Sequence, residues 1–392
     1  MRQAAISYLL DPIEPRILLS ADPMSVVLAN NIGVDAGAHV SATVRLFSES
    51  DGGAAVYKYE VRDTTTGDIL VAATQITSTG GLNFSSGSGD DSISLKFEDS
   101  FSYGSAFAVS VDGGTGADTV EVTSFAAGYL GNLNIASETV VVSAQIGSAG
   151  AYVNDVTIHA NSTATLATAS SQISVNASIF SQGIVTLSAQ AMVSGTINVA
   201  VPELGEDVST GQIARVTLAD NITVQAASLN ISTLARLDLN LAASNQLLFA
   251  GEVSVNSQSQ ITIGQGVILS TTNAAGIILA ASDIVNINAS VAAAELEILG
   301  EDIFNINALW MQVDVARIVG ISVGEAGVAG VPAADTEITA ADAGNVAITA
   351  SSTGVITTKV ESSFLGLAEV TIGVVNGAAG GVRIDLTNVI FD

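Results

Sequence analysis

The segment DIVNINA at Asp283–Ala289 recurs as DIFNINA at Asp302–Ala308, 19 residues further along the chain. In each copy apolar and polar side chains alternate, which is the two-residue period of a β-strand with one buried face. A single strand cannot bury so narrow a face by itself, so equivalent segments of successive coils must cover one another. The spacing falls within the roughly 18 to 30 residues that one coil of a β-helix needs. The repeat therefore predicts parallel strands stacked coil upon coil.

This spacing also predicts which residues lie above one another in neighbouring coils. The expected pairs are Ile287 with Ile306, Val285 with Phe304, Val291 with Trp310, and Asn288 with Asn307. The apolar pairs would form aliphatic columns in the interior. The asparagine pair would stabilise a tight corner, because asparagine tolerates left-handed backbone and its amide can bond to the next coil. We interpret it as a structural feature and not as a binding site.

Short alternating segments of the same kind fill the rest of the chain. Between 150 and 392 they include VTIHA, ISVNA, VTLSA, ITVQA and VAITA, separated by small or polar residues. Between 25 and 149 the segments VYKYEV, SISLKF and TVEV are bounded by Gly, Asp or Ser, as strands with turns are. The expected fold is all-β: a right-handed parallel β-helix (β-solenoid) over 150–392, preceded by an irregular β-rich region over 25–149 and a leader over 1–24.

The composition favours a solenoid over compact domains. The 392 residues are 48% hydrophobic but only 5% aromatic, so small aliphatic side chains must fill the interior. The competing all-β architecture is an array of immunoglobulin-like sandwiches, which usually bury a large aromatic residue in each domain of about 100 residues. A single Trp in the whole chain argues against that array.

Charge and residue usage exclude several classes of function. The chain has 11 Lys and Arg against 38 Asp and Glu, a formal net charge of -27, which repels nucleic acid and anionic membranes. Cysteine is absent, and His39 and His159 are the two histidines, so disulfides, cysteine catalysis and the usual zinc sites are not expected. No apolar run reaches about 18 residues, so no membrane-spanning helix is predicted.

The N-terminal stretch LDPIEPRILLSADP, residues 10–23, contains Glu-Pro-Arg followed by Leu18, Leu19 and a Ser-Ala-Asp sequel. It resembles the LEPR-XLL segment at the start of large, repeat-rich bacterial proteins, with Ile13 in place of the usual Leu. The resemblance covers about a dozen residues. It implies an extracellular or cell-surface protein of the adhesin or haemagglutinin-like kind, exported without a cleaved signal peptide. The alternative is a short capped helix after a proline-rich entry.

Two glycine-rich turns are the best candidates for a metal site. SGSGDDSIS at Ser86–Ser94 and GGTGADTVE at Gly113–Glu121 fit the nonapeptide GGxGxDxUx, with Ser86 replacing the first glycine. They resemble the calcium-binding RTX repeat, in which turn carbonyls and Asp carboxylates supply hard oxygen ligands to Ca²⁺. The candidate residues implied by this resemblance are Asp90, Asp91, Asp112, Asp118, Gly87, Gly89, Gly114 and Gly116.

The copies begin 27 residues apart, a spacing that one coil can span, so Asp91 and Asp118 could lie one above the other. The alternative is that both segments are ordinary Gly/Asp turns with no ligand.

No catalytic residue is predicted. The nearest approach to the site of a carbohydrate-active β-helix is Arg215 and Arg236 with Asp220 and Asp238, which exposed ion pairs explain more simply. The expected function is therefore a non-catalytic structural or adhesive stalk with cell-surface glycans or proteins as partners. The alternatives are a calcium-stabilised RTX-like module and a carbohydrate-active enzyme. Because VIFD at the end carries no polar cap, we expect the natural polypeptide to continue beyond Asp392.

Overall fold

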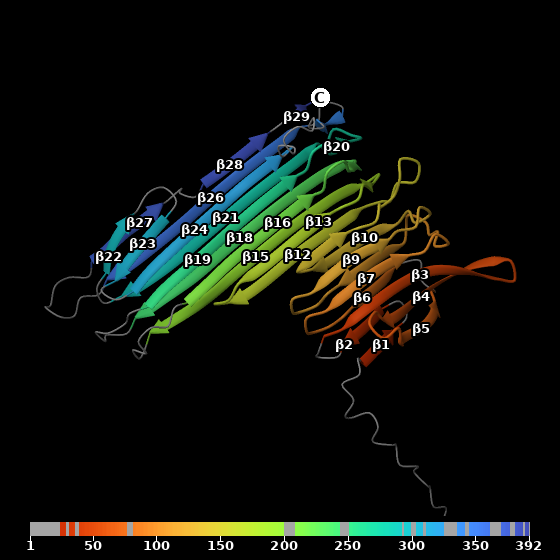
Figure 1. The fold of residues 1–392 in the computed structure, drawn as a ribbon, viewed down its shortest axis with the longest axis horizontal. Coiled ribbons are helices and arrows are strands. Elements are labelled where there is room, and N and C mark those ends of the chain that lie inside the picture. Colours follow the sequence, from red (N-terminus) through yellow and green to blue (C-terminus); the bar gives the residue numbers. More distant parts are fainter. Residues whose placement is uncertain are drawn as a thin grey trace, which may run out of the picture.

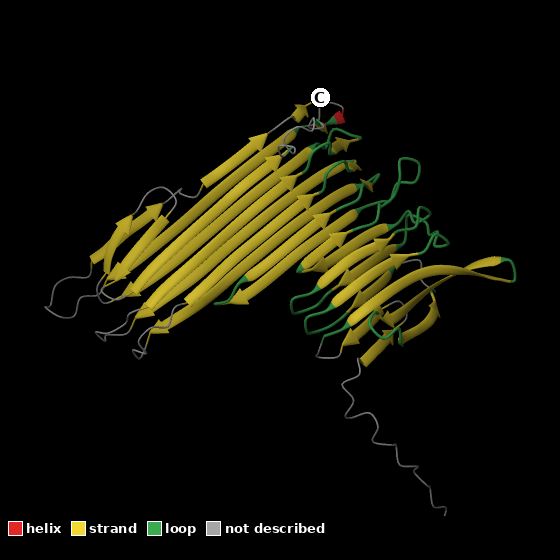
Figure 2. Ribbon diagram, in the orientation of Figure 1, coloured by secondary structure: helices red, strands yellow, loops and turns green. Residues whose placement is uncertain are grey.

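The computed structural model describes residues 24–28, 31–35, 39–76, 81–199, 208–243, 251–291, 294–298, 303–308, 311–324, 335–341, 345–360, 370–376, 381–386 and 389–391. Within these ranges the regular elements are β-strands; Ala341 has 3₁₀ conformation, and there is no α-helix (Figure 2). In the same residues no helix has the length and apolar character needed to cross a membrane. The LEPR-XLL-like stretch up to Pro23 and Trp310 lie outside the described residues.

The strands form three sheets, named here sheet 1, sheet 2 and sheet 3 (Figure 1). Sheet 1 contains, in order of pairing, β1 (Met24–Leu28), β2 (Asn31–Asp35), β6 (Leu82–Ser85), β8 (Ala108–Asp112), β10 (Asn132–Ser137), β12 (Val156–Thr165), β15 (Ile184–Val199), β18 (Ser228–Ala243), β21 (Ile277–Val291), β26 (Val346–Val360) and β27 (Val370–Asn376). Sheet 2 contains β22 (Ala294–Ile298), β23 (Ile303–Ala308), β24 (Met311–Val323), β19 (Gly251–Ile263), β16 (Val208–Leu218), β13 (Ala169–Val175), β11 (Thr139–Val142), β9 (Thr119–Ser124), β7 (Ser92–Phe97), β3 (Ser41–Asp51), β4 (Ala54–Asp63) and β5 (Ile69–Gln75), with β28 (Gly381–Leu386) also paired to β24. Sheet 3 contains β14 (Ile179–Phe180), β17 (Thr223–Ala226), β20 (Ile268–Thr271), β25 (Thr336–Thr339) and β29 (Val389–Phe391).

The chain runs through these sheets in turn. One passage through the sheets is called here a circuit, and the strands of one circuit form a rung of the stack. From β6 to β13 it alternates between sheet 1 and sheet 2, and from β14 onward it also passes through sheet 3. Strands of successive circuits pair in parallel, as β10 does with β8 on one side and β12 on the other. The prediction of an all-β chain with parallel sheets is confirmed. Each strand gains backbone partners from the circuits before and after it, which an isolated strand could not obtain.

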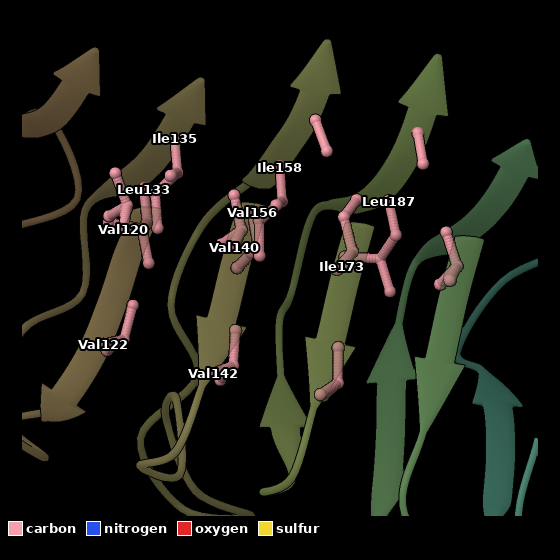
Figure 3. Close-up of a cluster of buried hydrophobic side chains, with 14 of the residues drawn as sticks. Val120, Val122, Leu133, Ile135, Val140, Val142, Val156, Ile158, Ile173 and Leu187 are labelled. Carbon is pink, nitrogen blue, oxygen red and sulfur yellow. The ribbon is translucent and has the colours of Figure 1, made fainter. Parts of the chain in front are cut away.

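Aliphatic side chains from sheets 1 and 2 point toward each other and form columns between the sheets (Figure 3). In sheet 1 one column runs through Ile135, Ile158 and Leu187, each directly beside the next. All three are fully buried. The opposite column in sheet 2 includes Val140 and Ile173. Small branched residues thus meet their counterparts above, below and across, which is how the short alternating segments bury their single apolar face.

The stacking predicted from the 19-residue repeat is wrong. Ile287 lies beside Leu239 and Ile356, whereas Ile306 belongs to β23, which runs antiparallel between β22 and β24. The predicted pairs Val285–Phe304 and Asn288–Asn307 are also wrong, since the partners in the structure are Val285 with Leu237, Phe304 with Val315, Asn288 with Asn240, and Asn307 with Glu295. The pair of Val291 with Trp310 stays a prediction, because Trp310 lies outside the described residues. The second copy of the repeat is one strand of a folded-back hairpin, so the similarity reflects a shared strand pattern and not one coil.

The circuits are shortest between β9 and β11, where Thr119 and Thr139 are 20 residues apart, and they lengthen from there toward the C-terminal part. Neighbouring rungs are 27 residues apart at Asp91 and Asp118. The separation is 44 residues at Ser188 and Ser232, and 69 at Ser282 and Ser351. The strands lengthen accordingly, from four residues in β11 to 16 in β18. The molecule therefore widens from its N-terminal to its C-terminal part (Figure 1).

Antiparallel strands lie at both ends of the stack. β1 pairs with β2, and β4 and β5 extend sheet 2 from β3. At the other end β23 folds back on β24 and β27 on β26. Such strands cover open edges that would otherwise attract further strands. Between them, β6 to β11 already pair in parallel, with one irregularity between Leu95 and Lys96 of β7, so this part of the predicted irregular region is continuous with sheets 1 and 2.

Aromatic side chains are concentrated in the narrow circuits, where the sequence had suggested only small residues. They come from β4, β7 and the loops after β7 and β9, and their rings contact one another with centroids 4.1 to 6.5 Å apart. The cluster consists of Tyr57, Phe97, Phe101, Tyr103, Phe107, Phe125 and Tyr129. Large rings thus fill the wider loops that flank the short strands.

Candidate cation site in an acidic column

The two glycine-rich turns lie on neighbouring rungs. The turn at Ser86–Asp91 connects β6 to β7, and the turn at Gly113–Asp118 connects β8 to β9. Their backbones bond to each other directly, since the Gly89 N–H donates to the Thr115 carbonyl and the Thr115 N–H donates to the Gly87 carbonyl, both at 3.0 Å. The two sequence copies are therefore successive turns of one stack.

The glycines of these turns are required by this close stacking. Gly114 has φ +91°, and a Cβ there would lie 1.9 Å from the Gly87 carbonyl oxygen. A Cβ on Gly116, with φ +153°, would lie 1.8 Å from the Gly89 carbonyl oxygen. Any side chain at these positions would collide with the backbone of the turn below. The glycine pattern thus has a packing explanation that needs no metal.

Three carboxylates at the entry to sheet 2, named here the acidic column, accept hydrogen bonds from the rung before each of them. They are Asp91, Asp118 and Glu138, and each comes directly before a strand of sheet 2. The Asp91 N–H donates to Asp118 Oδ1 at 2.8 Å, and the Asp118 N–H donates to Glu138 Oε2 at 3.0 Å. The Val40 N–H donates to Asp91 Oδ1 at 2.8 Å. One oxygen of each carboxylate therefore satisfies a backbone N–H at the corner.

The second carboxylate oxygens of both aspartates have no hydrogen-bond partner among the described residues. Asp91 is 3% exposed and Asp118 is fully buried, so water does not replace that partner freely. The Ser137 Oγ is also buried and without a partner. It lies on the same side of Gly113 as Asp118 Oδ2, because a Cβ on Gly113 would be 3.1 Å from each of the two oxygens. The acidic column thus contains spare, buried oxygen atoms.

Burial makes ionisation of Asp118 and Glu138 unfavourable. Desolvation raises the pKa of Asp118, and the nearby charge of Asp91 raises it further. Desolvation also raises the pKa of Glu138 to about 7, with a further contribution from the charge of Asp118. Stacked like charges in a buried site need either protons or a cation to offset them.

The other predicted ligands do not join the column. Asp90 and Asp112 are exposed, and each caps a backbone N–H of the turns: Ala117 donates to Asp90 Oδ1 at 2.9 Å, and Gly114 donates to Asp112 Oδ1 at 3.0 Å. Within the described part of the chain, no group of three or more Asp, Glu, His or Cys side chains has an arrangement that could hold a metal ion. The four predicted aspartates therefore form no such group among these residues.

The residues considered for carbohydrate chemistry are also separated. Arg215 lies on β16 of sheet 2, and Arg236 lies on β18 of sheet 1, so they do not occupy adjacent coils of one sheet. Arg236 forms an ion pair with Asp238 at 2.6 Å on its own strand. Asp220 accepts the backbone N–H of Gln265 at 2.9 Å. These contacts stabilise the surface and the corners and form no common cleft.

Sequence reasoning missed two polar groups, the half-buried Glu138 and the buried Asp283. Glu138 completes the acidic column, and its position directly before the TVVV strand is the same signal that Asp91 and Asp118 carry. Asp283 pairs with Arg317 in the interior of the wide circuits. By alternation Asp283 shares the face of Val285 and Ile287, so the phase of the strand already indicated a buried acid.

Comparison of the chain with protein-family models, with curated proteins and with solved structures finds no match.

Proposed function

We propose that this chain is a non-catalytic structural segment of a large surface-exposed bacterial protein, built as a right-handed parallel β-solenoid. The observation that carries the proposal is the uninterrupted parallel pairing from β6 to β26 in sheet 1, with aliphatic columns behind it. Such stacks gain stability rung by rung and form extended, rigid bodies. The LEPR-XLL-like stretch near the N-terminus supports export to the cell surface.

The outward faces of the sheets are suited to polar contacts. On sheet 2 a row of hydroxyl side chains runs along the stack through Ser174, Thr217, Thr262 and Ser322, each directly beside the next. Regularly spaced hydroxyls on a flat face can hydrogen-bond to glycans or to the polar surface of a protein. Cell-surface glycans or proteins are therefore the partners that we propose.

Small-angle X-ray scattering of the purified chain, combined with a turnover assay on acidic polysaccharides, tests this proposal. We expect the scattering of a rigid, flattened particle that is wider at one end, and no release of sugar products. A profile of separate flexible domains would contradict the solenoid. Measurable turnover would instead favour the carbohydrate-active alternative.

The second candidate function is stabilisation by Ca²⁺, favoured by the unpartnered oxygens of Asp91 and Asp118. These two oxygens and Ser137 Oγ would supply part of the six to eight oxygen ligands that Ca²⁺ takes, so carbonyls or water would have to supply the others. A cation here would also offset the stacked charges of the acidic column.

Replacing Asp118 by Asn distinguishes an acidic column that binds Ca²⁺ from one that only accepts backbone N–H groups. Asn keeps an oxygen that can accept the Asp91 N–H but removes one buried charge, so without Ca²⁺ the variant should be more stable than the parent. If the column binds Ca²⁺, the parent should gain about 2.7 kcal/mol when the metal exceeds its dissociation constant a hundredfold, and Asp118→Asn should lose most of that gain. Thermal unfolding in EDTA and in millimolar Ca²⁺ measures both effects.

Asp63→Asn is the matched control, because Asp63, the half-buried last residue of β4, accepts the N–H groups of Thr65 and Thr66 and lies outside the acidic column. Its response to Ca²⁺ should equal that of the parent. If the unfolding temperature of the parent does not change with Ca²⁺, the calcium function is excluded. The acidic column then serves only to accept hydrogen bonds from backbone N–H groups.

A further inference from the structure

The strand pattern of the wide circuits does not by itself fix their register. β18 and β21 are 16 and 15 residues long and alternate small apolar and polar side chains. A shift of one residue would turn every inward side chain outward, but a shift of two returns each to its original face. The inward neighbours of Asp283 on β21 are Ala281 and Val285, both buried, so an apolar column would tolerate such a shift.

One buried ion pair interrupts this uniform interior. Arg317 on β24 donates from Nε to Asp283 Oδ2 on β21 at 2.5 Å, and their side chains are 1% and 0% exposed. This contact joins sheet 2 to sheet 1. The second carboxylate oxygen of Asp283 accepts the Ser257 hydroxyl from β19 at 2.6 Å. Both oxygens of the buried acid are therefore satisfied, each by a residue of sheet 2.

The arginine is held equally closely. Its Nη2 donates to the backbone carbonyl of Thr353 on β26 at 2.6 Å and to that of Asp283 at 3.3 Å. Because these acceptors are backbone atoms of adjacent rungs in sheet 1, the guanidinium group contacts both β21 and β26. A shift of β21 by two residues would place Ala281 or Val285 opposite the guanidinium group and leave a buried charge without its partner, which is strongly unfavourable.

The pair also lies where the outer partner of β24 changes. Residues Met311–Ala316 of β24 face the antiparallel strand β23, whereas Ile318–Val323 face the parallel strand β28. Arg317 is the residue between these two segments. An error of alignment there would misplace both the folded-back hairpin and the parallel strand that share this edge.

We propose that the Asp283–Arg317 pair fixes the register of the wide circuits, and that its role is to select one alignment of β21 with β24 and β26. Replacing a buried ion pair by apolar residues often leaves stability unchanged or increases it, while a buried polar group can specify register. The pair is then needed for a unique arrangement more than for stability.

Engineered disulfides report the register, because the chain contains no cysteine. Ser282 and Ser351 lie directly opposite each other on β21 and β26, with their hydroxyl oxygens 3.2 Å apart. Ser282→Cys with Ser351→Cys should therefore form a disulfide in the native register. Ser282→Cys with Thr353→Cys should form one only after a shift of two residues. In the otherwise unchanged chain, only the first pair should oxidise.

Moving the acid by two residues tests the proposal. In the background Ala281→Asp with Asp283→Ala, Arg317 should attract the relocated carboxylate, and cross-linking should move from the 282/351 pair to the 282/353 pair. A second background, Asp283→Leu with Arg317→Met, should remain β-rich by circular dichroism but give both disulfides. If the first background does not fold, the disulfides formed in the second background test whether the ion pair fixes the register. Cross-linking of the 282/351 pair alone in the folded backgrounds would overturn the proposal.

Discussion

Replacing Arg317 alone by Met is expected to destabilise the chain by about 3–5 kcal/mol, because it leaves the carboxylate of Asp283 buried without its charged partner. The cost comes from an isolated negative charge in the interior, which the Ser257 hydroxyl at 2.6 Å cannot neutralise. Urea-induced unfolding followed by circular dichroism measures the change.

Arg236→Met is the matched control, since Arg236 forms an ion pair of the same kind at the surface. Arg236 and Asp238 are 44% and 41% exposed, and a pair at that exposure contributes about 0–1 kcal/mol. Equal effects of the two substitutions would contradict the assignment of the Asp283–Arg317 pair to the interior.

Gly114→Ala is expected to destabilise the narrow circuits strongly, with a loss of about 3 kcal/mol. The added Cβ would lie 1.9 Å from the Gly87 carbonyl oxygen, and the residue would keep a φ of +91° that side chains rarely adopt. The two stacked turns would have to separate, and the hydrogen bonds between them would be lost.

Gly104→Ala is the control for this substitution, because a Cβ at Gly104 would meet no atom within 4 Å. Its free energy of unfolding should stay within about 0.5 kcal/mol of that of the parent, as for most surface substitutions. A Gly114→Ala variant as stable as Gly104→Ala would show that the glycine-rich turns do not stack closely.

The sequence predicted strands well and their partners poorly. Val285 and Ile287 were correctly placed on one buried face, because alternation depends only on the strand itself. The partner of a strand depends on the length of the circuit, which varies from 20 to 69 residues along the stack. No repeat of constant length exists to reveal it. The resemblance of Asp283–Ala289 to Asp302–Ala308 therefore pointed to the wrong neighbour.

Stacking was predictable where backbone geometry restricts it. The turns at Gly87 and Gly114 require glycine because they lie one on another, and their spacing of 27 residues matched the circuit. The acidic column was found only in part, since Glu138 lies outside any glycine-rich motif. Arg317 could not be assigned a partner from sequence, because 34 residues separate it from Asp283 and no local pattern connects them.

Disulfide trapping with two alternative cysteine pairs tests the order of the rungs most directly. Asn288 is exposed beside Asn240 on the neighbouring strand of sheet 1, whereas Asn307 is 19 residues further along the chain on an antiparallel strand of sheet 2. Asn240→Cys with Asn288→Cys should therefore form a disulfide under mild oxidation, and Asn288→Cys with Asn307→Cys should not. Cross-linking of the second pair in place of the first would contradict the stacking of β21 on β18.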